Sequence, residues 1–265
     1  MKKKNKKIMF YKHKLSAKKN CVSKKYLCAI ILKKGNDMGK IIVVEGTDCS
    51  GKETQTKRLV QNLLDMGIKA IRMAFPMYDT PTGKIIGGAF LGKEQFDIKP
   101  VFEETSVNVP AKVSSLFYAA DRCYNKDKIQ KYLDDGYVVV LDRYVESNMA
   151  FQGCKMPPEK RQEFFEFVQK LEYDLLDIPK PDLRILLYMP IWASKILKNG
   201  RDEKPDQNER NEEYLSAAEE TYLLLAKLFD FKIIDCVQGD KIKTVDQIQS
   251  QVFDCVKNYL QNQKI

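Results

Sequence analysis

The feature that most constrains this chain is a glycine-rich turn between an apolar strand and an amphipathic helix. Residues 40–44 read KIIVV, the continuous apolar run of a buried parallel strand. The turn EGTDCSGKET follows over 45–54, and leucines recur at helical spacing from Leu59 onward. Glycines let successive backbone N–H groups point inward, while Lys52 and the helix N-terminus add positive charge. The pattern predicts a loop that binds a polyphosphate.

One residue of this loop departs from the usual pattern. The motif normally ends in Gly-Lys followed directly by Ser or Thr, whereas Lys52 is followed by Glu53, with Thr54 one position later. The hydroxyl that normally binds Mg²⁺ is therefore missing from its usual place. Thr54 could replace it, or Glu53 could hold the ion or its water shell. The loop still predicts a polyphosphate ligand, and it leaves the metal ligation open.

The positive charge of the chain is confined to its first residues. The net charge is +9, but residues 1–37 contain thirteen lysines and one acid, a balance of +12, which leaves −3 for residues 38–265. We therefore expect a basic, disordered extension over 1–37 and one folded domain over 38–265, long enough to bury a sizeable core. The acidic balance of the domain argues against a nucleic-acid partner.

The cysteines and the single histidine limit which catalytic groups the domain can use and indicate the cellular compartment. Seven cysteines lie at scattered positions without C-x-x-C spacing, which fits free thiols in a reducing cytoplasm. The one histidine, His13, lies in the basic extension, so a histidine base or histidine metal ligands are excluded for the domain. Phosphoryl transfer needs no histidine, because positioning and charge stabilisation dominate its catalysis. No segment is long and apolar enough to predict a membrane span.

Strand-like and helix-like segments alternate after Gly39. We expect strands near 40–45, 68–74, 137–142, 183–189 and 231–235. We expect helices near 52–66, 82–91, 109–134, 158–176, 190–199, 210–229 and 244–262. This alternation implies right-handed crossovers and a ligand site beyond the carboxyl ends of the strands. The predicted fold class is α/β, the P-loop NTPase fold: a five-stranded parallel sheet with helices on both faces and a mobile lid.

Two predicted strands end in residues suited to a charged ligand. The second is followed by Phe75 and Pro76, where proline favours an extended turn. The third ends in Asp142 and Arg143. Two charged side chains at the end of a buried strand are costly unless they bind a charged ligand or pair with each other. Asp142 is suited to hold Mg²⁺ through water, and Arg143 to bind a phosphate. The residues alone favour this role and a structural Asp–Arg pair equally.

The long helix predicted over 109–134 carries a second candidate pair. Tyr118 and Arg122 lie one turn apart, so an aromatic ring and a guanidinium project together, as a stacked base with a polar edge contact would require. Ordinary core packing is the commoner role of a helical tyrosine. The apolar stripe that we expect to face the core comprises Val113, Leu116, Phe117, Ala120 and Tyr124.

A polar segment over 199–210 is predicted to form the lid. Ten of its twelve residues are polar or charged, and Gly200 and Pro205 interrupt the helical pattern. Lids that close over phosphates commonly bring an arginine to the transferring group. Arg201 is the better candidate and Arg210 the second, while a plain solvated loop is the alternative.

Taken together, short motifs of this chain resemble those of thymidylate kinases, a family of P-loop nucleoside monophosphate kinases. The resemblance runs from Gly39 to about Leu260. Its order and spacing are specific, although each piece is short. The matching pieces are Glu45-Gly46-Thr47-Asp48, Phe75-Pro76, the segment 116–122 (LFYAADR), Asp142-Arg143-Tyr144, Ser147-Asn148 and the segment 179–183 (PKPDL).

The resemblance implies transfer of the ATP γ-phosphoryl group to dTMP, with Mg²⁺ as the ion. The residues that it implies around ATP are Gly46, Thr47, Asp48, Cys49, Ser50, Gly51, Lys52, Glu53 and Thr54. The implied metal ligands are Asp48, Asp142 and Glu53. The implied catalytic residues are Lys52, Arg143, Arg201 and Asp142. Arg201 is favoured for the lid because the loop has no arginine between its glycines.

The resemblance also implies roles on the acceptor side. Tyr118 would stack on thymine and Arg122 would contact its O4 edge, while Asn148 and Ser147 would read the base. Arg143 would clamp the acceptor phosphate, and Asp48 would reach the 3′-hydroxyl or the metal. The remaining implied contacts are Phe75 and Pro76, which line the site, and Phe151, which lies near C2′.

One residue departs from the family pattern, and two alternatives stay open. Tyr78 stands where many relatives place a phosphate-binding arginine, so Arg143 would carry more of the acceptor phosphate or a lid residue would help. One alternative is a kinase of the same fold acting on another nucleoside monophosphate or a deoxynucleoside. The other is a non-enzymatic P-loop nucleotide-binding protein anchored to RNA by the lysine-rich segment. A homodimer is implied by the resemblance alone.

Overall fold

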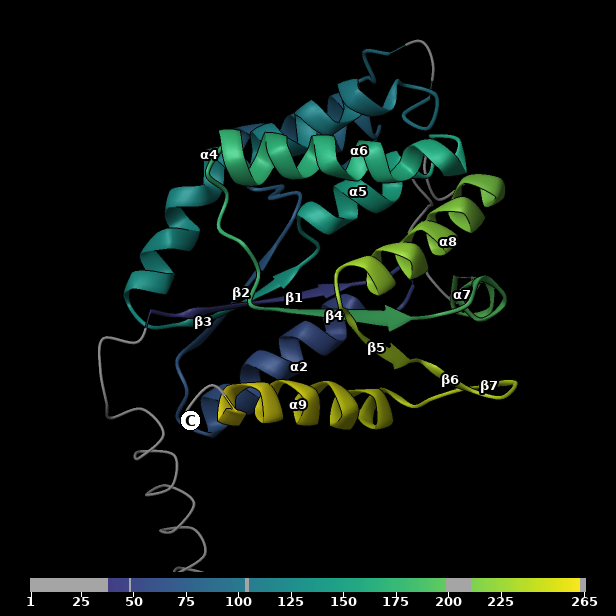
Figure 1. Cartoon of the computed structure of the whole chain (residues 1–265). Helices are drawn as coiled ribbons and strands as arrows, with labels where there is room; N and C mark the ends of the chain where they lie inside the picture. Colours follow the sequence, from purple (N-terminus) through teal and green to yellow (C-terminus); the bar gives the residue numbers. More distant parts are fainter. Residues whose placement is uncertain (1–37, 48, 103–104, 199–210, 263–265) are drawn as a thin grey trace, which may run out of the picture.

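A five-stranded parallel sheet forms the centre of the computed structural model (Figure 1). The structure describes residues 38–47, 49–102, 105–198 and 211–262. The strand order is β2-β3-β1-β4-β5. Its strands are β1 (Lys40–Glu45), β2 (Ala70–Ala74), β3 (Val138–Asp142), β4 (Leu183–Tyr188) and β5 (Lys232–Asp235). The predicted sheet is therefore confirmed, and the expected extension over 1–37 and lid over 199–210 lie outside the described residues.

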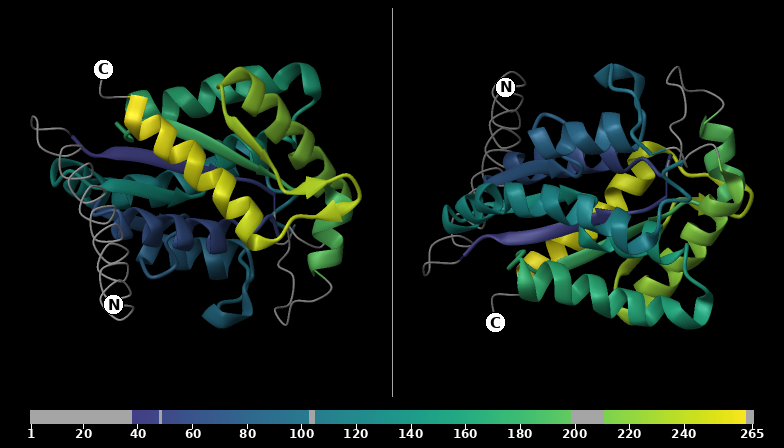
Figure 2. Two further views of the ribbon diagram at one scale, coloured as in Figure 1. Left: turned by 90° about the horizontal axis from the view of Figure 1, so that it is seen from below. Right: turned by 90° about the horizontal axis from the view of Figure 1, so that it is seen from above.

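Helices cover both faces of this sheet, as Figures 1 and 2 show. One face carries α2 (Lys52–Asp65) and α9 (Val245–Asn262), which pack on each other. The opposite face carries α4, α5, α6 and α8, and α7 lies beyond the carboxyl end of β4. Their bounds are α4 (Ala111–Asp134), α5 (Val145–Gly153), α6 (Arg161–Gln169), α7 (Ile191–Lys198) and α8 (Glu212–Leu228).

Alternation of side chains along the strands divides the core into two clusters. Ile41 and Val43 of β1 pack toward the α4–α8 face, while Ile42 and Val44 pack toward α2 and α9. This period of two is the ordinary geometry of a strand. Because crossover helices cover both faces of the sheet, β1 has to be apolar at nearly every position.

The register of the strands brings three chemically active ends together. Val44 of β1 and Ala74 of β2 both pair with Asp142 of β3. β1 and β3 are neighbours although the chain visits β2 between them, so the crevice beside them is where ligands bind in sheets of this kind. The phosphate-binding turn and the Asp142–Arg143 pair therefore share one edge.

The structure adds elements that the pattern analysis did not predict. Helix α5 directly follows β3, and an antiparallel hairpin joins β6 (Val237–Gln238) to β7 (Lys241–Ile242). The predicted helix over 82–91 is a short α3 (Pro81–Lys84) that continues as a π-helical segment over Ile85–Phe90. The predicted helix over 158–176 comprises a 3₁₀ turn over Pro158–Lys160, α6, and a π-helical segment over Lys170–Leu175. A further 3₁₀ turn spans Glu94–Phe96.

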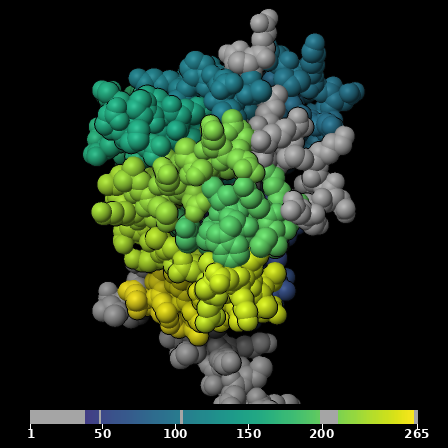
Figure 3. Space-filling model, turned by 90° about the vertical axis from the view of Figure 1, so that its right-hand side faces the viewer, coloured from purple at the N-terminus to yellow at the C-terminus, as the bar shows by residue number. Residues whose placement is uncertain are grey.

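The predicted core stripe of α4 is wrong. Val113, Leu116 and Tyr124 are 39%, 53% and 60% exposed, whereas the buried face of α4 carries Ser114, Ser115, Asp121, Arg122 and Asn125 among others. The helix is buried on its polar side because that side faces the crevice, the Asn148 amide of α5 and the Glu172 carboxylate of the 170–175 segment. Figure 3 shows a different side of the molecule, where α7, α8 and the β6–β7 hairpin form one continuous surface. Within the described ranges, no helix is long and apolar enough to cross a membrane.

Candidate active site

The phosphate loop has the backbone that its glycines predict. Gly46 has a φ of 154°, and a Cβ there would meet the Leu187 carbonyl oxygen at 2.7 Å. Lys52 is buried, and its Nζ donates to the Thr47 carbonyl at 2.6 Å and to Ser50 Oγ at 3.3 Å. The ammonium group is therefore held inside the curl of the loop, where a phosphate would bind. Asp48 lies outside the described residues.

Asp142, a predicted metal ligand, is engaged by an arginine that the sequence did not single out. Arg72 of β2 donates from NH2 to Asp142 Oδ2 at 2.6 Å and from Nε to Thr56 Oγ1 at 2.8 Å. Glu53 lines the same crevice, and its carboxylate pairs with Lys57 at 2.7 Å. Thr54 is exposed and does not line the crevice. Of the two replacements for the missing hydroxyl, the structure therefore places Glu53 nearer the site.

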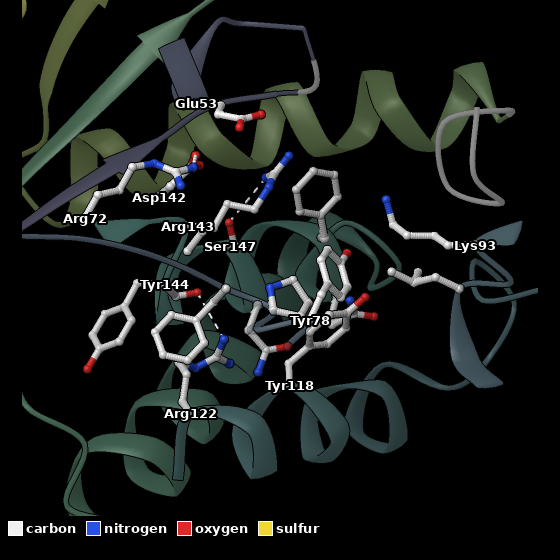
Figure 4. Close-up of a pocket in the computed structure, with 17 residues that line it drawn as sticks. Glu53, Arg72, Tyr78, Lys93, Tyr118, Arg122, Asp142, Arg143, Tyr144 and Ser147 are labelled. Carbon is white, nitrogen blue, oxygen red and sulfur yellow. Dashed lines mark hydrogen bonds and ion pairs between the residues drawn. The ribbon is translucent and has the colours of Figure 1, made fainter. Parts of the chain in front are cut away.

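Arg143 joins the phosphate loop to the rest of the crevice. Its NH1 donates to the Gly46 carbonyl at 3.2 Å, and to Ser147 Oγ and Tyr222 OH at 3.4 Å each. Its guanidinium carbon lies 5.0 Å from the centre of the Phe151 ring. Figure 4 shows the side chain reaching into the crevice between Glu53 and Ser147.

A buried carboxylate, Glu45, organises the groups around Arg143. Glu45 Oε1 accepts from the backbone N–H groups of Tyr144 and Ser147 at 2.8 and 3.1 Å. Its Oε2 accepts from the hydroxyls of Ser147 and Tyr222 at 2.6 and 2.9 Å. Burial raises the pKa of the Glu45 carboxyl above its usual value, and the neighbouring Glu146 adds to the effect. Glu45 thus ties the N-terminus of α5 to the strand that precedes the phosphate loop.

These groups line a cavity of about 390 Å³. A cavity of this size suits a small ligand with a few directional polar contacts. Tyr118 lines it and meets Phe90 edge-on at 5.9 Å between ring centres, and Lys93 lies 5.3 Å from the Tyr78 ring centre. The predicted substrate residues that line it are Phe75, Pro76, Tyr118, Arg122, Arg143, Ser147, Asn148 and Phe151.

Arg122 has a different environment from the one expected. It is 2% exposed, and its Nε and NH2 bind the two carboxylate oxygens of Glu172, the second at 2.6 Å. Its NH1 donates to the Tyr144 carbonyl at 3.4 Å. Asn148 donates to the same Glu172 at 2.8 Å and to the Ser115 carbonyl at 3.2 Å. Nε and NH2 of Arg122 are bound to Glu172 within the protein, so only its NH1 edge is left for a base contact.

The sequence analysis missed four residues that shape this site. Arg72 could have been noticed as the one charged side chain inside an apolar strand segment. Glu45 could have been noticed as an acid at the end of a buried strand. Glu172 and Tyr222 carry no local signal, because they reach the site only through the packing of distant helices.

The fold and the site together define a class of protein. A phosphate loop at the end of β1, a cavity suited to a nucleotide beside it, and an arginine between them are the parts of a P-loop nucleotide kinase. The family model for thymidylate kinases matches residues 44–248. The chain belongs to the thymidylate kinase family.

Curated relatives and a solved structure agree with this assignment. A thymidylate kinase from Prochlorococcus marinus (strain NATL2A) is 30% identical over 224 residues, which cover 83% of this chain and 99% of the relative. A thymidylate kinase from Thermosipho africanus is 29% identical with the same coverage. The structure of Candida albicans thymidylate kinase superposes with a TM-score of 0.62 at 24% identity, covering 83% of this chain and 92% of that one, and supports the fold.

Proposed function

We propose that this protein transfers the γ-phosphoryl group of ATP to the 5′-phosphate of dTMP, giving dTDP and ADP. The observation that carries this proposal is Arg143, whose guanidinium contacts the phosphate loop at Gly46 and lines the neighbouring cavity. An acceptor phosphate bound there would face the end of an ATP chain held by the loop. The family assignment supports ATP and dTMP as the two nucleotides.

The reaction depends on holding two anionic nucleotides in line. The acceptor phosphate is already an anion at neutral pH, so no strong protein base is required. In the proposed reaction Lys52 binds the donor phosphates and Arg143 the acceptor phosphate, and Arg201, which lies outside the described residues, is the candidate for a further cation. Fixed cations of this kind offset repulsion between the reactants and stabilise the charge of the transferring group.

The carboxylates at the edge of the cavity suit Mg²⁺. Mg²⁺ prefers oxygen ligands, keeps several waters, and is usually bound by one or two carboxylates together with substrate phosphates. Asp142 and Glu53 line the cavity, and no group of three or more His, Cys, Asp or Glu is gathered within the part of the chain that the structure describes. Asp142 and Glu53, with Asp48, would hold an ion shared with the phosphates, which would neutralise part of their charge.

A substrate panel tests the proposal and its rivals. A coupled ADP-release assay would compare dTMP with dUMP, dCMP, dAMP and thymidine as acceptors. We expect the highest kcat/KM with dTMP. A preference for another monophosphate or for thymidine would favour a related kinase. Negligible turnover with salt-sensitive RNA binding through residues 1–37 would favour the non-enzymatic alternative.

We also propose that the active form is a homodimer in a reducing, cytoplasmic compartment. Dimerisation is common in the family, and α4 exposes an apolar stripe of Val113, Leu116 and Tyr124 along one face. Five cysteines in the described ranges, Cys49, Cys123, Cys154, Cys236 and Cys255, are free thiols, which supports the compartment.

A further inference from the structure

Both carboxylates that line the cavity among the described residues are paired with a cation of the protein itself. Asp142 Oδ2 accepts from Arg72 NH2 at 2.6 Å, and the Glu53 carboxylate lies 2.7 Å from Lys57 Nζ. The first pair is largely shielded from solvent, with side chains 10% and 23% exposed, whereas both side chains of the second are more than half exposed. Because solvent screens an exposed pair, Arg72 is the cation that matters most here.

The position of Arg72 follows from the register of the sheet. Arg72 of β2 pairs with Val140 of β3, two residues before Asp142, so the side chains of Arg72 and Asp142 lie on the same face. Val140 packs with the core cluster on the α2 side, which identifies that face. Figure 4 shows the guanidinium beside the Asp142 carboxylate at the edge of the cavity. A charge in a covered strand is costly unless it is paired, and Asp142 is the partner of Arg72.

Arg72 is also held from the phosphate-loop side. Its Nε donates to Thr56 Oγ1 at 2.8 Å, and the Thr56 hydroxyl donates to the carbonyls of Lys52 and Glu53 at 2.8 and 3.1 Å. The guanidinium therefore joins the first turn of α2 to the end of β3. It occupies Oδ2 of Asp142, while Oδ1 accepts no hydrogen bond from the part of the chain that the structure describes. Groups that fix a metal-binding carboxylate in this way strongly affect metal affinity.

We propose that Arg72 is a positioning residue of the metal site, and that it makes binding of the divalent ion depend on the nucleotide. Arg72 fixes Oδ2 of Asp142 and leaves Oδ1 for the ion or its water shell. Its positive charge opposes a second cation beside Asp142 until donor phosphates add negative charge. An ion held by only one or two carboxylates takes further ligands from substrate phosphates. This inference rests on the proposed function for the ion and the donor nucleotide.

Mn²⁺ is the probe for this proposal, because the free ion is measured directly by electron paramagnetic resonance. Arg72→Met removes the charge and keeps a side chain of similar length, so the nucleotide-free variant should bind Mn²⁺ about tenfold more tightly than wild type. Arg72→Lys keeps the charge and should resemble wild type. With ADP bound, and after correction for free Mn²⁺–ADP, the affinity for Mn²⁺ should rise more in wild type than in Arg72→Met.

Three further variants separate this effect from a structural one. Arg58→Met is the matched control, because Arg58 is an arginine of α2 that pairs with Asp246 outside the cavity, and its affinity for Mn²⁺ should equal that of wild type. Adding Asp142→Asn to Arg72→Met should abolish the gain, which would assign the extra ion to Asp142. Arg72→Gln is uncharged but keeps a hydrogen-bond donor, and it should act like Arg72→Met if the latter proves unstable in a melting curve.

The nucleotide-free titrations decide the proposal. Affinity of Arg72→Met or Arg72→Gln for Mn²⁺ equal to or below that of wild type would overturn it. A gain that persists with Asp142→Asn, or an equal gain in Arg58→Met, would also overturn it. Wild type that binds Mn²⁺ equally with and without ADP would refute the dependence on nucleotide. Failure of wild type to phosphorylate dTMP would instead overturn the proposed function, and it would leave these titrations unchanged, so the two failures are distinguishable.

Discussion

Arg143 has a backbone conformation that its side chain does not favour. Its φ is 65°, in the left-handed region that non-glycine residues seldom adopt. Its backbone N–H donates to the Val44 carbonyl at 3.2 Å, and its guanidinium is held by the Gly46 carbonyl and two hydroxyls. Strained residues held in this way by their surroundings are concentrated at functional sites. The strain places a guanidinium between the loop and the cavity.

Arg143→Ala should therefore lower kcat by about a hundredfold or more, because in the proposed reaction it removes a charge that would face the transferring group. The fold should persist, because the Arg143 side chain is not part of the apolar core. Alanine at this position would have the same strained φ as arginine, so the substitution adds no backbone strain. The measurement is steady-state turnover with dTMP, alongside a melting curve. Arg58→Ala is the control, because Arg58 is an exposed arginine of α2 paired with Asp246. Activity of the Arg143 variant within tenfold of wild type would refute its role.

Tyr222 positions Arg143 from a helix that the motifs do not mark. Its hydroxyl lies 2.9 Å from both Glu45 Oε2 and Ser147 Oγ and accepts from Arg143 at 3.4 Å. We expect Tyr222→Phe to lower kcat several-fold with little change in KM for ATP, because Arg143 loses one of its acceptors. Tyr173→Phe is the control: that hydroxyl donates to buried Glu146 at 2.9 Å, away from Arg143. Equal loss of kcat in both variants would indicate a structural effect only.

At the scale of elements, the sequence predicted the structure wherever residues close together in the chain determine it. The strands were predictable because runs such as Ile41–Val44 are apolar on both faces, as a covered parallel sheet requires. The phosphate loop was predictable because glycine, lysine and the strand before them act locally. Eight residues that line the cavity were also predictable from the family motifs, although their partners were not, and Arg72, which lines the same cavity, was missed.

Burial of polar residues explains what could not be predicted. The stripe of α4 was assigned to the core because periodicity assumes that apolar side chains face inward. Here Asp121 accepts from the Met77 backbone N–H at 2.8 Å, and Arg122 binds Glu172, so the polar face is the inner one. These contacts join residues 44 and 50 positions apart. Whether such contacts form depends on the tertiary packing of distant segments, which no local sequence pattern predicts.

Lys155 links α5 to the start of α4, and this link should depend on pH. Its Nζ donates to the carbonyls of Ser106 and Val109 at 2.8 and 3.0 Å and to Ser114 Oγ at 3.2 Å. Burial lowers the pKa of Lys155 from 10.5 to about 8. Between these two values the unfolded chain binds a proton that the folded chain has lost, so the contribution of Lys155 to stability rises with pH.

The comparison of wild type with Lys155→Met tests this sign. Melting temperatures would be measured from pH 7 to pH 10.5. Relative to the variant, wild type should gain stability as pH rises above about 8. A difference that stays constant over this range would show that the pKa of Lys155 is close to its ordinary value. A difference that falls with rising pH would show that the three hydrogen bonds favour the ammonium form more than burial opposes it.

At the scale of the whole molecule, the apolar stripe of α4 is left on the surface by the same packing that buries its polar face. Val113, Leu116, Ala120 and Tyr124 recur at helical spacing, and all four are exposed. A second copy of the chain, packed through its own α4, would cover both stripes at once, as a two-fold interface requires. The proposed homodimer therefore predicts that this stripe lies at its centre.

Leu116→Glu should convert the dimer to a monomer, because two buried carboxylates would face each other across the interface without partners. The mass in solution would be measured by light scattering after size-exclusion chromatography, with a melting curve to confirm that the monomer folds. Leu64→Glu is the control: Leu64 is 46% exposed, but it lies on α2, on the other face of the sheet. A monomeric wild type would refute the dimer, and a Leu116 variant that stays dimeric would place the interface elsewhere.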